Sequence, residues 1–309
     1  LASAASLPAA QSYPVKPIRF VVPYPPGGID PSLRIMIPKM TEVLGQQPIV
    51  DNRPGANGLI GAEIVSRSAP DGYAMLFVAA STMVSGALLS KEIKIDPLKD
   101  FTPITELYRT LQVLAVHSSL SVNSLKELVD YAKRSPGKLS YGSAGVGSSF
   151  QLDTEQFKLV TGTDIVHIPY KGTGPYTSDL LVGLIQMGIL PMVNLRPHLA
   201  SGKIKLLAVY EDKRHPAYPN IPTIAENFPA MVKVGGGAGI YGPPNLPRAI
   251  TLRIHDAAVA AMRTQEVRDY HDQASAVIWA TNPEQFSAAI KEEWDKRLQL
   301  IKTVGLKPE

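Results

Sequence analysis

Loops rich in glycine and hydroxyl residues follow short apolar runs at four places in this chain. They span residues 25–30 (PPGGID), 81–82 (ST), 143–149 (SAGVGSS) and 171–180 (KGTGPYTSDL). Each loop ends in residues that commonly begin helices. A helix N-terminus carries about half a positive charge, and glycine lets a ligand approach its unpaired backbone N–H groups. We therefore expect these loops to bind an anion such as a carboxylate or a phosphate.

The first loop shows the pattern in full. The apolar run IRFVVPY predicts a buried strand, and Asp30 followed by Pro31 predicts an N-cap with proline at the first helical position. In open α/β sheets, ligands bind beyond the carboxyl ends of strands, so the loops predict a pocket wall. Any single loop could be an ordinary turn chosen for positive φ and capping. The recurrence of the pattern after strands favours a ligand site.

Three charged residues near these loops each have two interpretations. As an N-cap, Asp30 satisfies helix amides; as a ligand contact, it would repel a carboxylate but accept a hydroxyl or an ammonium group. We favour the capping role. Arg109 and Lys171 are candidate charge partners for a second carboxylate, although such side chains are more often solvated surface charges.

Strand-like runs alternate with amphipathic helical runs along the chain, which is typical of βαβ units on a mostly parallel sheet. Stretches near residues 101–119 and 207–229 look like crossings between domains. Paired crossings indicate domains that are discontinuous in sequence and hinged by two strands. The predicted division is residues 13–107 for the first part of domain 1, 108–212 for domain 2 and 213–309 for the helical return to domain 1.

The composition limits the class of protein. The 309 residues are enough for two α/β domains. Lys+Arg of 31 against Asp+Glu of 27 gives a net charge of +4, too small and too scattered for nucleic-acid binding or a polybasic membrane anchor. The lack of cysteine excludes a disulfide scaffold, thiolate catalysis and cysteine-bound metals. Residues 1–12 resemble the remnant of a secretory signal peptide, which predicts export; a disordered leader is the alternative.

Enzyme signatures are missing from the sequence. It contains neither a Gly-x-x-x-x-Gly-Lys-Ser/Thr loop nor a Gly-x-Ser-x-Gly elbow, and GSAGVG has the wrong glycine spacing for a dinucleotide fingerprint. The six histidines lack the i, i+4 pairing of a helical zinc site. The loops offer serine, threonine, tyrosine and amides with no histidine beside them in sequence. We predict a binding protein without catalytic residues, metal or cofactor; the alternatives are an enzyme acting on a carboxylate and a ligand-sensing protein for a signalling partner.

Six ordered segments together resemble one known family, the periplasmic solute-binding receptors of tripartite tricarboxylate transporters, or Bug proteins. The segments are YPVKPIRFVVPYPPGGID, VDNRPGANGLIGAEIVSRSAPDGYAMLF, KDFTPI, SLKELVDYAKRSPGKLSYGSAGVGSS, DIVHIPYKGTGP and IPTIAE. The resemblance implies a periplasmic-binding-protein-like (type II) clamshell of two α/β domains joined by a two-strand hinge. It also implies an exported protein that holds a small carboxylate in the interdomain cleft and delivers it to a membrane transporter. We expect a monomer and no nucleic-acid partner.

The resemblance also implies which residues form the ligand site. In such receptors, loop amides, hydroxyls and ordered water typically hold one carboxylate. Carried onto this sequence, the implied residues on one lobe are Tyr24, Pro25, Pro26, Gly27, Gly28, Ile29, Asp30, Ser81 and Thr82. Those on the other lobe are Ser143, Ala144, Gly145, Val146, Gly147, Ser148, Tyr170 and Pro191.

Two departures from the family pattern bear on the ligand. Ile29 stands where a small or hydroxylated residue is usual, and Ile189-Leu190-Pro191-Met192 stands where a polar or acidic residue often follows the strand. The second departure indicates a less polar distal pocket. Such a pocket favours an aromatic or a longer aliphatic acid over a small hydroxy-tricarboxylate.

Overall fold

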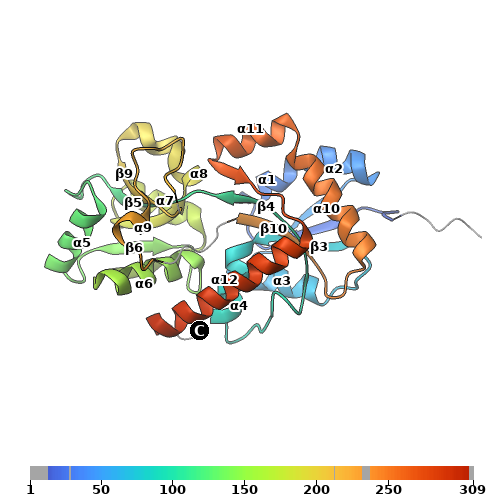
Figure 1. The fold of residues 1–309 in the computed structure, drawn as a ribbon, viewed down its shortest axis with the longest axis horizontal. Helices are drawn as coiled ribbons and strands as arrows, with labels where there is room; N and C mark the ends of the chain where they lie inside the picture. Colours follow the sequence, from blue (N-terminus) through green and yellow to red (C-terminus); the bar gives the residue numbers. More distant parts are fainter. Residues whose placement is uncertain (1–12, 28, 212, 232–236, 306–309) are drawn as a thin grey trace, which may run out of the picture.

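The computed structural model describes residues 13–27, 29–211, 213–231 and 237–305 and shows two lobes, each built around one β-sheet (Figure 1). The leader at residues 1–12 lies outside the described residues, as does Gly28. No helix in the described ranges is long and apolar enough to cross a bilayer.

The first lobe contains a six-stranded sheet of order β11-β4-β10-β3-β1-β2. Its strands are β1 (Arg19–Val22), β2 (Ile49–Asn52), β3 (Ala74–Ala79), β4 (Thr102–Thr110), β10 (Gly237–Gly242) and β11 (Ala276–Ile278). Its helices are α1 (Asp30–Arg34), α2 (Ile37–Leu44), η1 (Ala56–Gly58), α3 (Leu59–Ser66), α4 (Ala80–Leu89), α10 (Arg248–Met262), α11 (Gln265–Gln273) and α12 (Pro283–Val304). Separate apolar cores fill the space on the two sides of this sheet.

The second lobe contains a five-stranded sheet of order β7-β6-β8-β5-β9. Its strands are β5 (Gln112–His117), β6 (Ser140–Ser143), β7 (Val166–Pro169), β8 (Met187–Pro191) and β9 (Ile204–Val209). Its helices are α5 (Leu125–Arg134), α6 (Ser149–Thr161), α7 (Thr173–Leu181), α8 (Met192–Leu195), η2 (Arg196–Ser201) and α9 (Ile224–Asn227). Two further apolar cores flank this sheet.

Both sheets are mixed, so the prediction of mostly parallel sheets is wrong in one respect. β10 runs antiparallel to β3 and β4, β11 runs antiparallel to β4, and β5 runs antiparallel to β8 and β9. β5 and β10 are each the first strand to enter a sheet after the chain passes from the other lobe, and β11 follows β10 through α10 and α11. A strand that enters from the other lobe arrives without a βαβ crossover, and that crossover is the connection that makes neighbouring strands parallel.

The chain passes between the lobes at a short link. β4 of the first sheet ends at Thr110 and β5 of the second sheet begins at Gln112, with Leu111 between them. The return runs from β9 to β10 and includes residues outside the described ranges. The exact domain boundaries after residues 107 and 212 stay predictions; β4 continues in the first sheet to Thr110, and Ile224 of α9 packs in a core of the second lobe.

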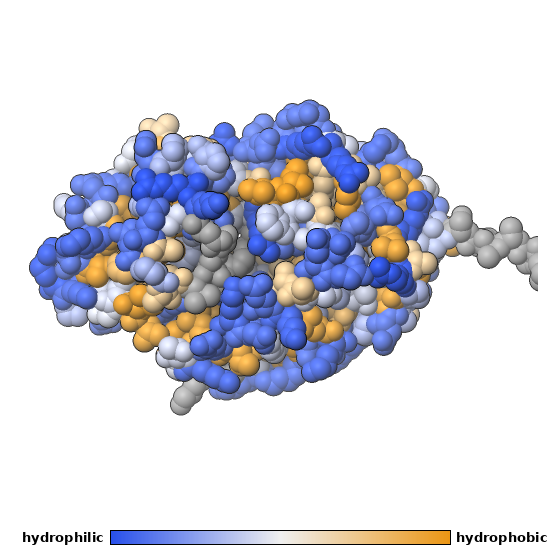
Figure 2. Space-filling view, in the orientation of Figure 1, coloured by the Kyte–Doolittle hydropathy of each residue, from blue (hydrophilic) through white to orange (hydrophobic). Residues whose placement is uncertain are grey.

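The long helix α12 joins the lobes on one side of the molecule. Leu300 and Ile301 of α12 pack with Leu89 of α4 and with Leu152 of α6, which belongs to the second lobe. Figure 1 shows α12 running from the first lobe towards α6, and Figure 2 shows hydrophilic residues over its outer face. An apolar stripe that faces inward and a polar face that meets solvent are the pattern of an amphipathic helix. These contacts therefore form a buried apolar seam between the lobes.

A buried ion pair lies beside this apolar seam. Arg297 of α12 has no exposed surface; its Nε donates to Glu293 at 3.0 Å, and its Nη1 lies 3.5 Å from Oδ1 of Asp153 on α6. Burial raises the pKa of Glu293 to about 7 and that of Asp153 to about 6, although Arg297 opposes both shifts. Charge, as well as apolar surface, is therefore buried where α12 meets the second lobe.

Truncating Leu152 to alanine should destabilise the protein, because this side chain is fully buried at the apolar seam. We expect Leu152→Ala to lower the free energy of unfolding by about 2–5 kcal/mol in urea denaturation. Leu159 on the same helix is 47% exposed, so Leu159→Ala is a matched control with an expected change within about 0.5 kcal/mol. Equal effects of the two variants would contradict the assignment of the apolar seam.

The raised pKa of Glu293 predicts a pH dependence of stability. The folded protein holds a proton on Glu293 up to about pH 7, whereas the unfolded chain releases it near the ordinary glutamate pKa. This group therefore contributes stability at low pH that is lost as pH rises through 7. Between about pH 5.5 and about pH 8, the free energy of unfolding should fall more steeply in the wild type than in Glu293→Gln. Equal slopes in denaturation series would show that Glu293 is not the group responsible.

Candidate ligand-binding site

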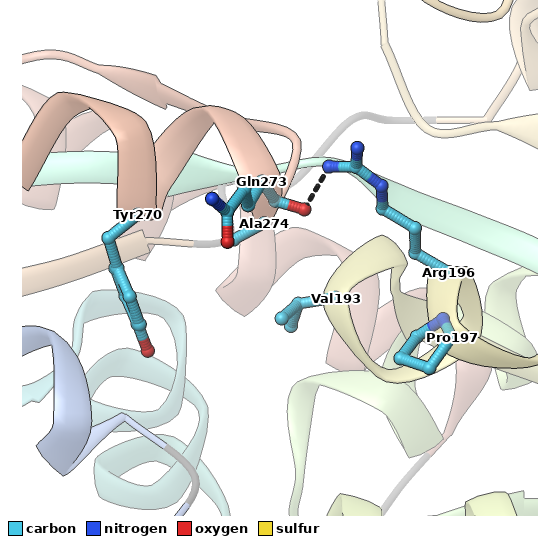
Figure 3. Close-up of a pocket in the computed structure, with 6 residues that line it drawn as sticks. All are labelled: Val193, Arg196, Pro197, Tyr270, Gln273 and Ala274. Atoms are coloured by element: carbon cyan, nitrogen blue, oxygen red, sulfur yellow. Dashed lines mark hydrogen bonds between the residues drawn. The ribbon is translucent and has the colours of Figure 1, made fainter.

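A cavity of about 540 Å³ lies between the lobes on the side where α8 faces α11 (Figure 3). In Figure 1 these helices lie at the top of the view, whereas α4, α6 and α12 lie towards the bottom. The second lobe contributes Val193, Arg196 and Pro197 to the lining, and the first lobe contributes Tyr270, Gln273 and Ala274. One cation, one phenol and one amide therefore border this space together with apolar side chains. This volume is in the range of small-molecule sites.

The predicted first loop adjoins this cavity through α11. α1, which begins at Asp30, contacts α11. Burial raises the pKa of Tyr270, and the negative charge of Asp30 raises it further. The phenol of Tyr270 therefore lies within the electrostatic reach of the loop that precedes α1.

Within that loop, the predicted N-cap role of Asp30 is wrong. The N-cap is Ile29, and Asp30 is the first residue of α1. The buried Asp30 carboxylate reaches back instead: Oδ1 accepts the N–H of Gly27 at 2.7 Å, and Oδ2 pairs with Arg34 at 2.9 Å. Because α1 starts one residue earlier than expected, the carboxylate meets the loop amide and not the amides of the first turn. The N–H of Gly27 is thus already paired.

The loop at residues 143–148 is held in the same way. The N–H of Gly147 donates to Oε1 of Gln151 at 2.7 Å, and the N–H of Gly145 donates to Oγ of Ser143 at 3.2 Å. Ser148 caps α6 as predicted, its hydroxyl accepting the N–H of Gln151. The expectation of unpaired loop amides is therefore wrong at Gly27, Gly145 and Gly147.

A histidine adjoins this loop although none does so in sequence. Nε2 of His167 lies 2.7 Å from Oγ of Ser143, and its ring stacks on Tyr141 at 4.8 Å. Ser143 has no exposed surface, and its hydroxyl also donates to the carbonyl of Gly145. A serine nucleophile must reach its substrate, so this buried pair positions the loop.

The remaining predicted residues are spread over both lobes. Of the first-lobe residues, Pro25, Pro26 and Gly27 are exposed, Tyr24 and Ile29 are partly buried, and Ser81 is buried within α4; the Thr82 side chain lies outside the described structure. Of the second-lobe residues, Val146 is exposed, Ala144, Gly145, Tyr170 and Pro191 are partly buried, and Ser143, Gly147 and Ser148 are buried.

Some of these predicted residues make contacts that place their loops. A Cβ added to Gly147 would lie 3.5 Å from Cβ of Leu89, so the loop at residues 143–148 reaches α4 of the first lobe. The N–H of Tyr170 donates to the carbonyl of Ser143, and its hydroxyl donates to Asp179 at 2.6 Å. None of the predicted residues is among the six that line the cavity.

The two candidate charge partners differ in their surroundings. The Arg109 guanidinium donates to both carboxylate oxygens of Glu106, at 3.0 and 2.9 Å, and lies over the ring of Trp279. Lys171 is exposed. Arg109 therefore already has an anionic partner within the protein.

The apolar residues at the end of β8 and the start of α8 are placed differently from the prediction. Ile189, Leu190 and Met192 are fully buried in the cores of the second lobe, so they do not line the cavity. Val193, Arg196 and Pro197 line it instead, a few residues further along. Sequence reasoning missed these residues because no motif marks them. The available signal was their place beyond the carboxyl end of a strand.

Comparisons with known proteins identify the family of the chain. The family model of the tripartite tricarboxylate transporter family receptor matches residues 33–306. The solved structure of the periplasmic binding protein BugD is 29% identical, with a TM-score of 0.87, covering 96% of this chain and 100% of BugD. Rpa4515 of R. palustris, solved with adipate, is 30% identical, with a TM-score of 0.87 and coverage of 96% and 100%. MatC of Rhodopseudomonas palustris, solved with malate, is 26% identical, with a TM-score of 0.85 and coverage of 94% and 100%.

These similarities extend over nearly the whole chain and both of its lobes. They confirm the predicted fold class, a periplasmic-binding-protein clamshell of two α/β domains. The chain belongs to the receptor family of the tripartite tricarboxylate transporters.

Proposed function

We propose that this protein captures a small organic carboxylate between its lobes and delivers it to the membrane subunits of a tripartite tricarboxylate-type transporter. The observation that carries the proposal is the interlobe cavity, which Tyr270 and Gln273 border with polar side chains. A phenol and an amide each donate hydrogen bonds that a carboxylate accepts. The adipate and malate bound by the relatives Rpa4515 and MatC support the same class of ligand.

We infer that the ligand is a dicarboxylate with an aliphatic or aromatic body. Val193, Pro197 and Ala274 give the cavity an apolar part next to its donors. Ligand sites commonly combine such walls with a few placed polar groups. The predicted preference for longer acids therefore depends on these three residues and no longer on the residues of β8.

The proposed site combines the cavity with the loops on either side. Asp30 and Gln151 fix the amides of Gly27 and Gly147, so the loops present a rigid wall in place of free donors. We place recognition of the ligand in side chains and in ordered water held by this wall. Binding without turnover and a periplasmic location are part of the proposal; the monomeric state stays a prediction.

A screen of carboxylates tests the ligand class. Adipate, malate, citrate and benzene carboxylates should be compared by thermal shift and calorimetry. A ligand present at 100 times its dissociation constant should add roughly 2.7 kcal/mol to the free energy of unfolding. We expect dicarboxylates or benzene carboxylates to bind more tightly than citrate. Failure of every carboxylate to bind, together with turnover of some substrate, would replace the receptor assignment with an enzymatic one.

Paired substitutions at Asp30 test the role of the first loop. Asp30→Ala removes the acceptor that holds the Gly27 amide, and we expect about tenfold weaker adipate binding in calorimetry. Asp30→Asn keeps an oxygen for that amide and removes a negative charge near the ligand, so its affinity should equal or exceed that of the wild type. Wild-type affinity in both variants would exclude this loop from the site.

A further inference from the structure

The two lobes contact each other in two chemically different ways. Below the sheets, α4, α6 and α12 form the buried apolar seam. Beside the cavity, polar side chains of the second lobe meet residues 272–275 of the first lobe. A polar contact at the surface exchanges readily for water, whereas a buried apolar contact does not. The polar contacts beside the cavity are therefore the ones that can exchange when the lobes turn about the link at Leu111.

Arg196 makes the central contact on the cavity side. Its Nη1 donates to the main-chain carbonyl of Asp272 at 3.2 Å and to that of Gln273, the contact drawn in Figure 3. These carbonyls belong to the last turn of α11, which carries partial negative charge; that of Asp272 also accepts the N–H of Ser275 at 3.0 Å. A guanidinium from the opposite lobe supplies both hydrogen bonds and the complementary charge.

We propose that Arg196 is a positioning residue that latches the second lobe onto the C-terminal end of α11 and so holds the cavity closed. α11 also carries Tyr270 and Gln273, which line the cavity. Release of the latch therefore moves one wall of the cavity away from Val193 and Pro197. The effect on ligand affinity rests on the proposed function, but the closure itself does not.

A second contact reaches the same segment. The hydroxyl of Tyr218, which packs against the core of the second lobe, lies 3.2 Å from Oγ of Ser275. Ser275 follows directly after the end of α11. Arg196 and Tyr218 of the second lobe thus both contact the segment 272–275 of the first lobe.

The latch can be tested without any ligand. Since the chain has no cysteine, Val182→Cys on the second lobe and Leu252→Cys on the first give one specific pair of label sites; these side chains are 64% and 36% exposed. Single-molecule energy transfer between the labels reports the interlobe distance. We expect Arg196→Ala to shift the population towards longer distances and Arg196→Lys to give an intermediate result. Arg134→Ala, which removes an exposed arginine on α5 of the same lobe, should match the parent protein.

An unchanged distance distribution in Arg196→Ala would overturn the latch. The melting temperatures of Arg196→Ala and Arg134→Ala should agree, because both side chains are exposed. Agreement shows that a change in distance reports closure and not unfolding.

Binding of adipate as a probe gives the second readout. If Arg196 acts by closure, Arg196→Ala should raise the dissociation rate about tenfold and change the association rate much less. A loss of affinity with unchanged interlobe distances would make Arg196 a direct ligand contact and overturn the latch. If the wild type binds none of the screened carboxylates, the proposed function fails, while the distance measurement still decides the latch.

Discussion

A buried guanidinium beside two acidic side chains connects α12 to the second lobe. Arg297 of α12 has no exposed surface and lies between Glu293 of its own helix and Asp153 of the second lobe. Removing a charge from water is costly, and the arrangement is favourable only while its partners stay in place. Together with Leu89, Leu152, Leu300 and Ile301, the ion pair makes α12 a fixed connection across the molecule. These contacts hold the end of α12 against both lobes.

Hydrogen bonds within the protein likewise fix the loops near the cavity. A backbone N–H without a hydrogen-bond partner costs free energy, and the cost is largest when the group is buried. In this chain Asp30, Ser143 and Gln151 satisfy the amides of Gly27, Gly145 and Gly147. The protein itself therefore supplies the partners of these amides, and donors on Tyr270 and Gln273 border the cavity. A preformed wall lowers the conformational cost of binding.

Much of the fold follows from local patterns in the sequence. The strand-loop-helix repeats predicted β1, β3, β6 and the helices after them, because apolar runs and capping residues act over a few positions. Ser148 caps α6 as its type indicates. The antiparallel insertion of β5 and β10 could not be predicted, since strand direction there depends on the passage between lobes. The cavity residues could not be predicted for a related reason: Arg196 and Tyr270 line the cavity from opposite lobes, and neither carries a signal within its own segment.

Leu111 places a strict limit on how the lobes can move. It is the single residue between β4 and β5; its N–H donates to Ser275 of the first lobe, and its carbonyl accepts the N–H of Met192 of the second. Neighbouring Cα atoms stay about 3.8 Å apart across a trans peptide, so this link cannot lengthen. Torsion about its φ and ψ is the freedom that remains. At this point the protein behaves as a swivel joint: its halves can turn about a point, but they cannot slide past each other.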